Sequence, residues 1–303
     1  MLKKITNNSQ ICIIASDPGG AEPLYRICKE INCKKFFFLS GAAKKIFKNI
    51  KSNKSSELNK SILKSDFVLC SSSFSELSYY NAIQFAKCNN IHTTLVLDHW
   101  TFFKDRLKKN RNDKLPDDVV VFDIHAKKIV NKEFPKLKTI LMKNPYLFDL
   151  IDKIKKKSEK KDVSKKVILY CTDKIENMPT IKKPIYDYSV YNYNEFEALK
   201  FFFINLKKIG IEVDQIILRT HPNEKVNKYK KIINEFKNEY DIITNNKDDL
   251  ITQIAKSDFV VGCETFPMVI ASMSAKKVFS SVPPNGKEIS LPQKNIKYIR
   301  DLI

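Results

Sequence analysis

Residues 214–224 read DQIILRTHPNE, and this stretch decides how the rest of the chain is interpreted. The mostly apolar run Gln215–Leu218 predicts a buried strand, and the residues after it predict a polar turn. A helix from about residue 226 to residue 237 is expected to follow. Pro222 disfavours helical backbone at His221, which therefore marks the corner between strand and helix. Ligands of open α/β sheets bind beyond the carboxyl ends of the strands, so His221 is a candidate site residue.

Two interpretations of His221 remain open. Beside a helix N-terminus, an imidazole can donate a hydrogen bond to a phosphate oxygen. Alternatively, the ring caps the helix or satisfies the loop, because a well-placed histidine is only a probabilistic marker of a site. Arg219 occupies the same strand end and is a candidate substrate-binding residue.

The composition is that of a folded protein of two domains. The chain has 303 residues, of which 43% are hydrophobic, so a large core is expected and disorder is not. No apolar run approaches the roughly 20 residues that a membrane span needs. Residues 1–16 lack the pattern of a signal peptide, and we expect a cytoplasmic protein. Seven cysteines without a CxxC pair favour reduced core thiols over disulfides or zinc.

The formal net charge of +20 has two interpretations. A basic face could bind nucleic acid, anionic lipid or a phosphorylated substrate. Alternatively, the charge reflects a lysine-rich composition, because only five of the 54 basic residues are arginine. Arginine makes the bidentate contacts on which base recognition depends, and its scarcity argues against nucleic acid as a partner. We favour the compositional interpretation, with a peripheral attraction to the anionic inner face of the membrane.

The chain begins with the pattern of a doubly wound unit. Residues 11–15, ICIIA, predict a strand, and a helical pattern follows at residues 23–31. Between them, Gly19 and Gly20 allow a ligand to approach the backbone closely, although the GxGxxG fingerprint of dinucleotide sites is absent. Asp17 is a candidate general base. The alternative for Asp17 is a helix cap or an Asx turn.

A second polar cluster follows the strand predicted at residues 92–97, HTTLVL. Asp98 and His99 stand there beside the only tryptophan, Trp100, and an aromatic and charged loop comes next. Such a loop can stack on a sugar ring and bind its hydroxyl groups. We therefore predict His99 as a substrate-binding residue and Asp98 as an alternative base. The opposing interpretation is a packed aromatic loop with a surface carboxylate.

Residues 155–166, KKKSEKKDVSKK, form the best domain boundary because they are charged and carry few core residues. We predict a first domain over residues 1–154, this linker, and a second domain over residues 167–303. Both halves alternate predicted strands and helices, which indicates the α/β class.

The second half holds a further strand-to-helix turn at Gly262-Cys263-Glu264-Thr265. The first N–H groups of the following helix and the hydroxyl of Thr265 can hold a phosphate, and Glu264 can accept hydrogen bonds from a ribose. N-terminal capping is the alternative for both residues. Ser280 and Ser281 lie at the end of the next predicted strand.

The pairing of His221-Pro222 with residues 257–265, SDFVVGCET, resembles the donor half of GT-B glycosyltransferases of bacterial capsule and lipopolysaccharide synthesis. Sialyl- and polysialyltransferases use such an HP motif, and teichoic-acid glycerophosphotransferases have comparable turns. The resemblance implies two Rossmann-like domains facing a central cleft. It also implies that His221 contacts the donor phosphate, that Thr265 and Glu264 contact phosphate or ribose, and that Ser280 and Ser281 match a serine pair of the polysialyltransferases. Residues 17–20, DPGG, depart from the acidic base motif of the sialyltransferases, which leaves the base and the sugar open.

The implied activity is the transfer of a sugar from a nucleotide-activated donor to a glycan or a lipid-linked acceptor in surface polysaccharide synthesis. No cofactor, metal or nucleic acid is expected to take part. Two alternatives remain, namely a sugar-nucleotide epimerase or hydrolase of the same fold, and a non-catalytic module that binds a nucleotide or a glycan.

Overall fold

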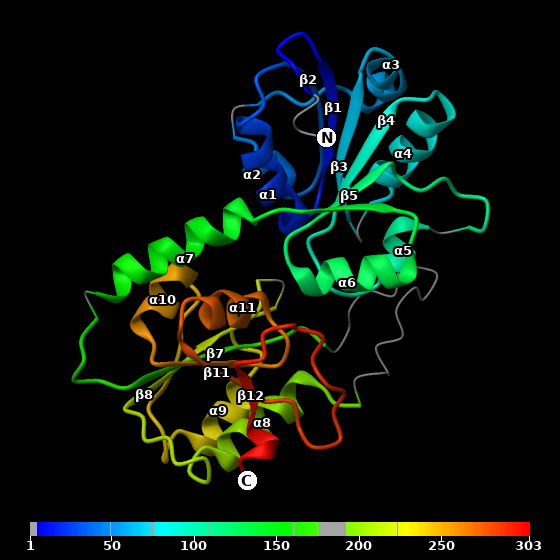
Figure 1. Cartoon of the computed structure of the whole chain (residues 1–303). Coiled ribbons are helices and arrows are strands. Elements are labelled where there is room, and N and C mark those ends of the chain that lie inside the picture. Colours follow the sequence, from blue (N-terminus) through cyan, green and yellow to red (C-terminus); the bar gives the residue numbers. More distant parts are fainter. Residues whose placement is uncertain are drawn as a thin grey trace. The chain divides into compact units, whose positions relative to one another are not determined.

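The computed structural model describes residues 5–48, 50–73, 76–108, 110–159, 161–175, 192–222 and 224–303. It divides into two compact units, Met1–Phe148 and Asp149–Ile303 (Figure 1). The division falls inside helix α7 (Pro145–Ser158). Residues 155–158, expected as the start of the linker, therefore continue a helix.

Unit 1 contains one parallel six-stranded sheet in the order β2-β1-β3-β4-β5-β6. The strands are β1 (Gln10–Ala15), β2 (Lys34–Leu39), β3 (Phe67–Ser71), β4 (His92–Val96), β5 (Asp118–Val121) and β6 (Lys138–Leu141). The helical segments before α7 are α1 (Pro18–Lys29), α2 (Ala43–Ile46), η2 (Ser55–Glu57), α3 (Leu58–Leu63), α4 (Ser78–Cys88), α5 (Phe103–Leu107) and α6 (Ile124–Glu133).

Strand β1 is apolar throughout because both faces of the sheet are covered. Ile11 and Ile13 pack with residues of α1 such as Leu24 on one face. Cys12 and Ile14, which alternate with them, pack with residues of α3 and α4 on the other face. A strand buried on two sides needs a continuous apolar run, and this requirement explains the ICIIA sequence.

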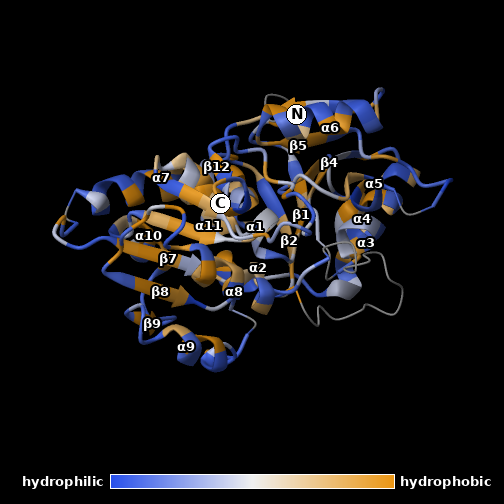
Figure 2. Ribbon diagram, turned by 90° about the horizontal axis from the view of Figure 1, so that it is seen from below, coloured by the Kyte–Doolittle hydropathy of each residue, from blue (hydrophilic) through white to orange (hydrophobic). Residues whose placement is uncertain are grey.

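Unit 2 repeats this architecture with the strand order β12-β11-β10-β7-β8-β9, again parallel throughout. Figure 2 shows hydrophobic residues along β7 and β8, in keeping with a buried sheet. The strands are β7 (Val167–Cys171), β8 (Gln215–Arg219), β9 (Ile242–Thr244), β10 (Phe259–Gly262), β11 (Lys277–Ser280) and β12 (Ile296–Tyr298). The helices are α8 (Glu195–Asn205), α9 (Lys230–Phe236), α10 (Leu250–Lys256), α11 (Phe266–Met273) and η4 (Ile299–Asp301).

The α/β fold class is thus confirmed, but the helix expected from about residue 226 begins later than predicted. Helix α9 begins only at Lys230, so no helix N-terminus adjoins the imidazole. The side chain of Glu224 instead accepts the backbone N–H of His221 at 3.2 Å and keeps the chain in a turn. Local hydrogen bonds of this kind compete with helix formation.

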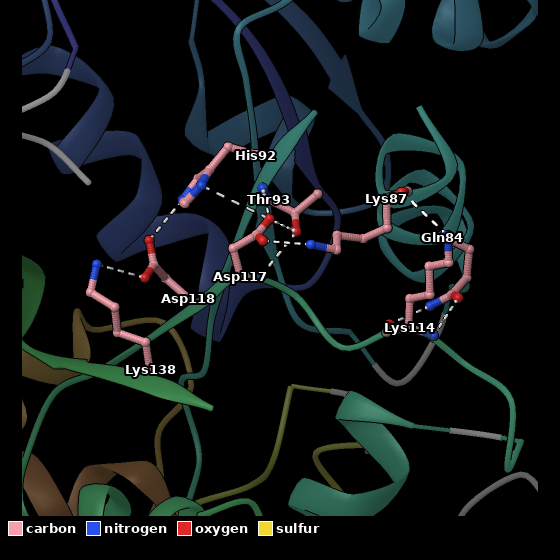
Figure 3. Close-up of polar contacts among 8 residues, drawn as sticks. All are labelled: Gln84, Lys87, His92, Thr93, Lys114, Asp117, Asp118 and Lys138. Carbon is pink, nitrogen blue, oxygen red and sulfur yellow. Dashed lines mark hydrogen bonds and ion pairs between the residues drawn. The ribbon is translucent and has the colours of Figure 1, made fainter. Parts of the chain in front are cut away.

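The amino edge of the unit 1 sheet carries a cluster of ion pairs (Figure 3). His92, Asp118 and Lys138 are the first residues of the neighbouring strands β4, β5 and β6. His92 Nε2 lies 2.8 Å from Asp118 Oδ2, and Lys138 Nζ lies 3.0 Å from Asp118 Oδ1. Beside them, Asp117 pairs with Lys87 at 2.5 Å. These contacts join the three strands at the edge opposite to the predicted site residues.

Candidate functional site

The strand order of each sheet creates one topological switch point. In unit 1 the chain leaves β1 for β2 and later returns to β3 on the other side of β1. In unit 2 the chain leaves β7 for β8 and later returns to β10 on the other side of β7. Ligands of doubly wound sheets bind at such points, outside the carboxyl ends of the strands. The β1–β3 and β7–β10 strand ends are therefore the places where a site is expected in each unit.

Asp17 lies at the unit 1 switch point and does not cap a helix. It has the extended backbone of the N-cap position of α1, but its side chain makes no capping hydrogen bond. Its Oδ2 atom instead accepts a hydrogen bond of 2.8 Å from the hydroxyl of Ser73, which follows β3. The Ser73 oxygen in turn accepts the N–H of Glu76. The Asp17 carboxylate is therefore oriented across the switch point, from β1 towards β3.

The two glycines of this turn allow close packing. A Cβ atom on Gly19 would overlap Oδ2 of Asp98, and one on Gly20 would lie 2.7 Å from Cβ of Ser71. The start of α1 can therefore approach the ends of β3 and β4 only because these residues have no side chain. The Ser71 hydroxyl is buried here and has no hydrogen-bond partner in the part of the chain that the structure describes.

Asp98 is held in place by Arg106, which sequence reasoning did not single out. The Nη1 atom of Arg106 donates to Ser72 Oγ at 2.7 Å and to Asp98 Oδ1 at 3.3 Å. Ser72 Oγ donates to the same Asp98 oxygen at 2.9 Å. The one available signal in the sequence was the rarity of arginine, which makes up only five of the 54 basic residues.

The loop after β4 is packed and tied to the loop after β5. Trp100 donates its indole N–H to Asp123 Oδ2 at 2.5 Å, and the ring of His99 lies 5.7 Å from that of Trp100. His99 Nδ1 also lies 3.0 Å from the hydroxyl of Thr101. Burial lowers the pKa of His99, with a smaller opposing effect of Asp98. This geometry agrees with the packed-loop interpretation, and substrate binding by His99 stays a prediction.

The His221 turn in unit 2 is built around one carboxylate. Glu224 accepts hydrogen bonds from Thr172 Oγ1 at 2.7 Å, from Lys228 Nζ at 2.7 Å and from Tyr229 OH at 3.0 Å, besides the His221 N–H. Its side chain is 1% exposed. Burial raises its pKa, but the hydrogen bonds of Lys228, Thr172 and Tyr229 outweigh burial, so the pKa of Glu224 is lowered. Glu224 is therefore an anion that fixes the backbone of His221.

The imidazole of His221 is half-buried at the carboxyl end of β8. Burial lowers its pKa, and the neighbouring Glu224 opposes this effect. The ring is therefore mostly neutral at pH 7 and has one N–H to donate.

Thr265 carries a second unsatisfied hydroxyl, at the unit 2 switch point. It has the N-cap backbone of α11 without a capping hydrogen bond from its side chain. Its Oγ1 is buried, and no partner reaches this atom among the described residues. Pro267 in the first turn has no N–H, which reduces the number of donors at this helix start.

Glu264 does not cap α11 either. Its Oε1 accepts the N–H of Ser290 at 2.9 Å and also the Ser290 hydroxyl, so it binds the segment after β11. Its backbone N–H donates to Oδ2 of Asp173 at 2.8 Å. Asp173 follows β7 and was not among the sequence candidates. Burial raises the pKa of Asp173 to about 7, and the nearby carboxylates of Glu264, Glu224 and Glu195 add to this effect.

The remaining candidates make internal contacts. Arg219 Nη1 donates to the Asp248 carbonyl at 2.8 Å and to Gln253 Oε1 at 2.7 Å. Ser280 and Ser281 are fully buried. Their hydroxyls donate to the carbonyls of Cys263 and Gly262, each at 3.2 Å. These bonds join the end of β11 to the end of β10, and ligand contacts by the three residues stay predictions.

No protein-family model and no curated protein matches the sequence. Solved structures match most of it. UDP-GlcNAc 2-epimerase from Neisseria meningitidis bound to UDP-GlcNAc is 13% identical, with 89% of this chain and 81% of that chain covered and a TM-score of 0.56. S. aureus MnaA with UDP is 15% identical, with 90% and 78% covered and a TM-score of 0.55. MurG from Acinetobacter baumannii is 11% identical, with 95% and 80% covered and a TM-score of 0.52.

The chain has the GT-B architecture. Its two parallel six-stranded sheets and their helices correspond to those of the three structures. At identities this low, the likeness of the structures establishes the fold alone, and the function has to be argued from the site. Within the described residues, no three His, Cys, Asp or Glu side chains gather as ligands for a metal ion. None of the helices that the structure describes is long and apolar enough to cross a bilayer.

Proposed function

We propose that this GT-B protein is a glycosyltransferase that moves a sugar from a nucleotide-activated donor to a glycan or lipid-linked acceptor in surface polysaccharide synthesis. The observation that carries the proposal is the pair of prepared switch points. Unit 1 offers an oriented carboxylate in Asp17, and unit 2 offers a neutral imidazole in His221 and an unsatisfied hydroxyl in Thr265.

Unit 2 is the proposed donor side. A sugar transfer places growing negative charge on the phosphate of the leaving nucleotide, and fixed hydrogen-bond donors stabilise such charge. The N–H of the His221 ring and the O–H of Thr265 are donors of this kind. The rigidity of the His221 turn supports the assignment, because Glu224 and Thr172 accept the backbone N–H of His221.

Unit 1 is the proposed acceptor side, with Asp17 as the base that takes the proton of the attacking hydroxyl. Asp98 was the alternative base. Its Oδ1 atom accepts from Arg106 and Ser72, and its Oδ2 atom lies against Gly19. The ion pair with Arg106 and the hydrogen bond from Ser72 tie Asp98 into the packed loop, which supports Asp17 as the base and Asp98 as the residue that positions the loop.

A lipid-linked acceptor and a peripheral contact with an anionic membrane belong to the proposal. Four large apolar side chains are exposed at or beyond the carboxyl ends of the adjacent strands β3 to β6, namely Leu77, Phe102, Ile124 and Leu141. Exposed Lys104 and Lys128 lie on α5 and α6 nearby. Apolar side chains flanked by lysines suit an anionic lipid surface.

Donor binding and transfer are tested in two steps. A thermal-shift screen with CMP-, UDP-, GDP- and CDP-linked sugars should identify a donor that raises the melting temperature. Thr265→Val, which keeps the shape of the side chain and removes the hydroxyl, should weaken this effect. A chain that responds to none of these donors would not be a sugar-nucleotide enzyme.

The second step separates transfer from the alternatives. A glycosyltransferase releases the nucleotide only when an acceptor glycan is present. An epimerase or hydrolase, which the likeness to the Neisseria structure keeps as the second candidate, converts the donor without an acceptor. Tight donor binding without turnover under either condition would indicate a non-catalytic binding module.

A further inference from the structure

Acidic side chains crowd the unit 2 edge at which the proposed function requires a phosphate. Asp173 follows β7, Glu224 follows β8, Glu264 follows β10, and Glu195 is the first residue of α8. Lys228 pairs with both Glu195 and Glu224, at 2.7 Å in the second case. Glu264 binds Ser290 instead of a cation. A phosphate that arrives here meets an excess of negative charge unless one of the acids is neutral.

Asp173 is the candidate for that neutral acid. It stands at the end of β7, the strand from which the sheet order diverges. Its Oδ2 atom accepts the backbone N–H of Glu264 at 2.8 Å. Its other oxygen, Oδ1, accepts no hydrogen bond in the part of the chain that the structure describes. A proton on Oδ1 would turn an acceptor into a donor at the β7–β10 switch point, close to the start of α11.

We propose that Asp173 binds a phosphate oxygen of the donor as a neutral carboxylic acid, with Oδ1–H as the hydrogen-bond donor. The inference rests on the proposed donor-binding function and adds to it a residue and a proton. Above neutral pH the proton comes from solvent when the sugar nucleotide binds, and it returns to solvent when the nucleotide leaves. No covalent bond other than this O–H bond changes.

Asp173 is the group of this cluster whose titration falls near neutral pH. Burial raises its pKa to about 7; the hydrogen bond from the Glu264 N–H opposes this effect, and the neighbouring acids add to it. Burial raises the pKa of Tyr170, Tyr193 and Cys263 above their usual ranges, so these groups remain uncharged. Lys228 remains a cation, because its ion pairs outweigh burial and raise its pKa. The remaining charged neighbours are Glu195, Glu224, Glu264 and Lys174.

Protonation of His221 would also favour the binding of an anion. Burial lowers its pKa below the usual 6.5, so it takes up protons at a lower pH than Asp173 does. A change in affinity between about pH 7 and pH 8 therefore reports on Asp173. His221→Asn should leave this part of the pH profile unchanged.

The first test is the dissociation constant of the sugar nucleotide that gives the largest shift in the thermal screen. If only the neutral acid binds it, the constant rises about tenfold from about pH 6 to about pH 8. Asp173→Asn should bind equally tightly over this range. Asp214→Asn is a matched control, because Asp214 also caps one backbone N–H, that of Lys166 at 2.7 Å, but at the amino edge of the sheet. This control should keep the wild-type pH profile.

The second test needs no variant. Calorimetry in two buffers of different ionisation enthalpy should show that binding takes up about half a proton near pH 7. Binding without proton uptake, or uptake that persists in Asp173→Asn, would overturn the role of Asp173 and leave the donor site intact. No binding at any pH would overturn the donor site as well, so the two failures are distinguishable.

Discussion

Nη1 of Arg106 lies 3.3 Å from Oδ1 of Asp98, in an ion pair whose side chains are only 3% and 14% exposed. Ser72 bridges the same two groups. The pair joins α5 to the loop after β4, directly beside the start of α1. A buried pair of this kind contributes little net stability when intact, but the loss of one partner leaves a charge without compensation.

Arg106→Met should therefore destabilise unit 1 by about 3–5 kcal/mol, because the Asp98 carboxylate remains at a largely buried position. Urea unfolding followed by circular dichroism measures the loss. Arg111→Met is the matched control, since Arg111 is exposed between elements and its substitution should change stability by less than about 0.5 kcal/mol. Equal effects of the two substitutions would show that the Arg106–Asp98 pair does not support the loop.

Asp17→Asn should reduce turnover by about 10²–10⁴-fold and leave the affinity for the donor unchanged, because the amide cannot accept the proton of an acceptor hydroxyl. Ser73→Ala is the companion variant. It removes the hydrogen bond that orients Asp17 and should reduce turnover by a smaller factor. Initial rates at saturating donor give the comparison. A large loss of donor affinity in Asp17→Asn would assign the carboxylate a structural role instead.

His221→Ala should lower turnover by about 10²–10³-fold, the loss usual for one donor to a developing anion. The turn should survive, because Thr172 and Glu224 accept the backbone N–H of His221, which the substitution keeps. Unchanged unfolding curves beside lost activity would agree with this reasoning. Activity that persists with the screened donor would remove the ring from the donor site.

Glu224→Gln should behave in the opposite way and destabilise unit 2. The wild-type pKa of Glu224 is lowered in the folded state, so the stability that this carboxylate contributes is present above its usual pKa of 4.5. That contribution is lost as the pH falls through the folded pKa. The difference in melting temperature between wild type and variant should therefore shrink towards acidic pH. A difference that is independent of pH would mean that the charge of Glu224 is not what stabilises the turn.

The sequence was sufficient to predict the strands of both sheets, because these strands are short apolar runs that end at polar turns. Gln215–Leu218 was expected as a strand, and β8 spans Gln215–Arg219. The start of α9 was not predictable in the same way. The chain after Pro222 is held by Glu224, whose partner Thr172 lies 52 residues earlier in the sequence, at the end of another strand.

The positions of the candidate residues at strand ends were predicted better than their contacts. Asp17, Asp98, His221 and Thr265 all lie at carboxyl ends of strands, since the turn after each apolar run locates them. Arg106 and Asp173 were missed. Their surroundings depend on which strands are neighbours, and local sequence patterns do not contain the strand order. The surroundings of a buried arginine and of an acid among other acids become visible only once the loops of separate strands are packed together.

Asp118→Asn, in the cluster at the amino edge of the unit 1 sheet, should cost about 1–3 kcal/mol of stability at pH 7. Asp118 is 1% exposed and binds His92 and Lys138, which both reach solvent and are rehydrated when the charge is removed. Burial raises its pKa, but the neighbouring Lys138 and His92 outweigh burial and lower it.

The sign of the pH effect follows from this lowered pKa. The stability that Asp118 contributes is present above its usual pKa of 3.8 and is lost as the pH falls through the folded pKa. The wild type should therefore lose more stability than Asp118→Asn between about pH 5 and pH 2. Lys200→Met, which breaks the exposed pair with Glu235, is the control and should cost less than about 1 kcal/mol. Parallel acid-unfolding curves for wild type and Asp118→Asn would contradict the prediction, because the cluster would then not stabilise the amino edge of the sheet through charge.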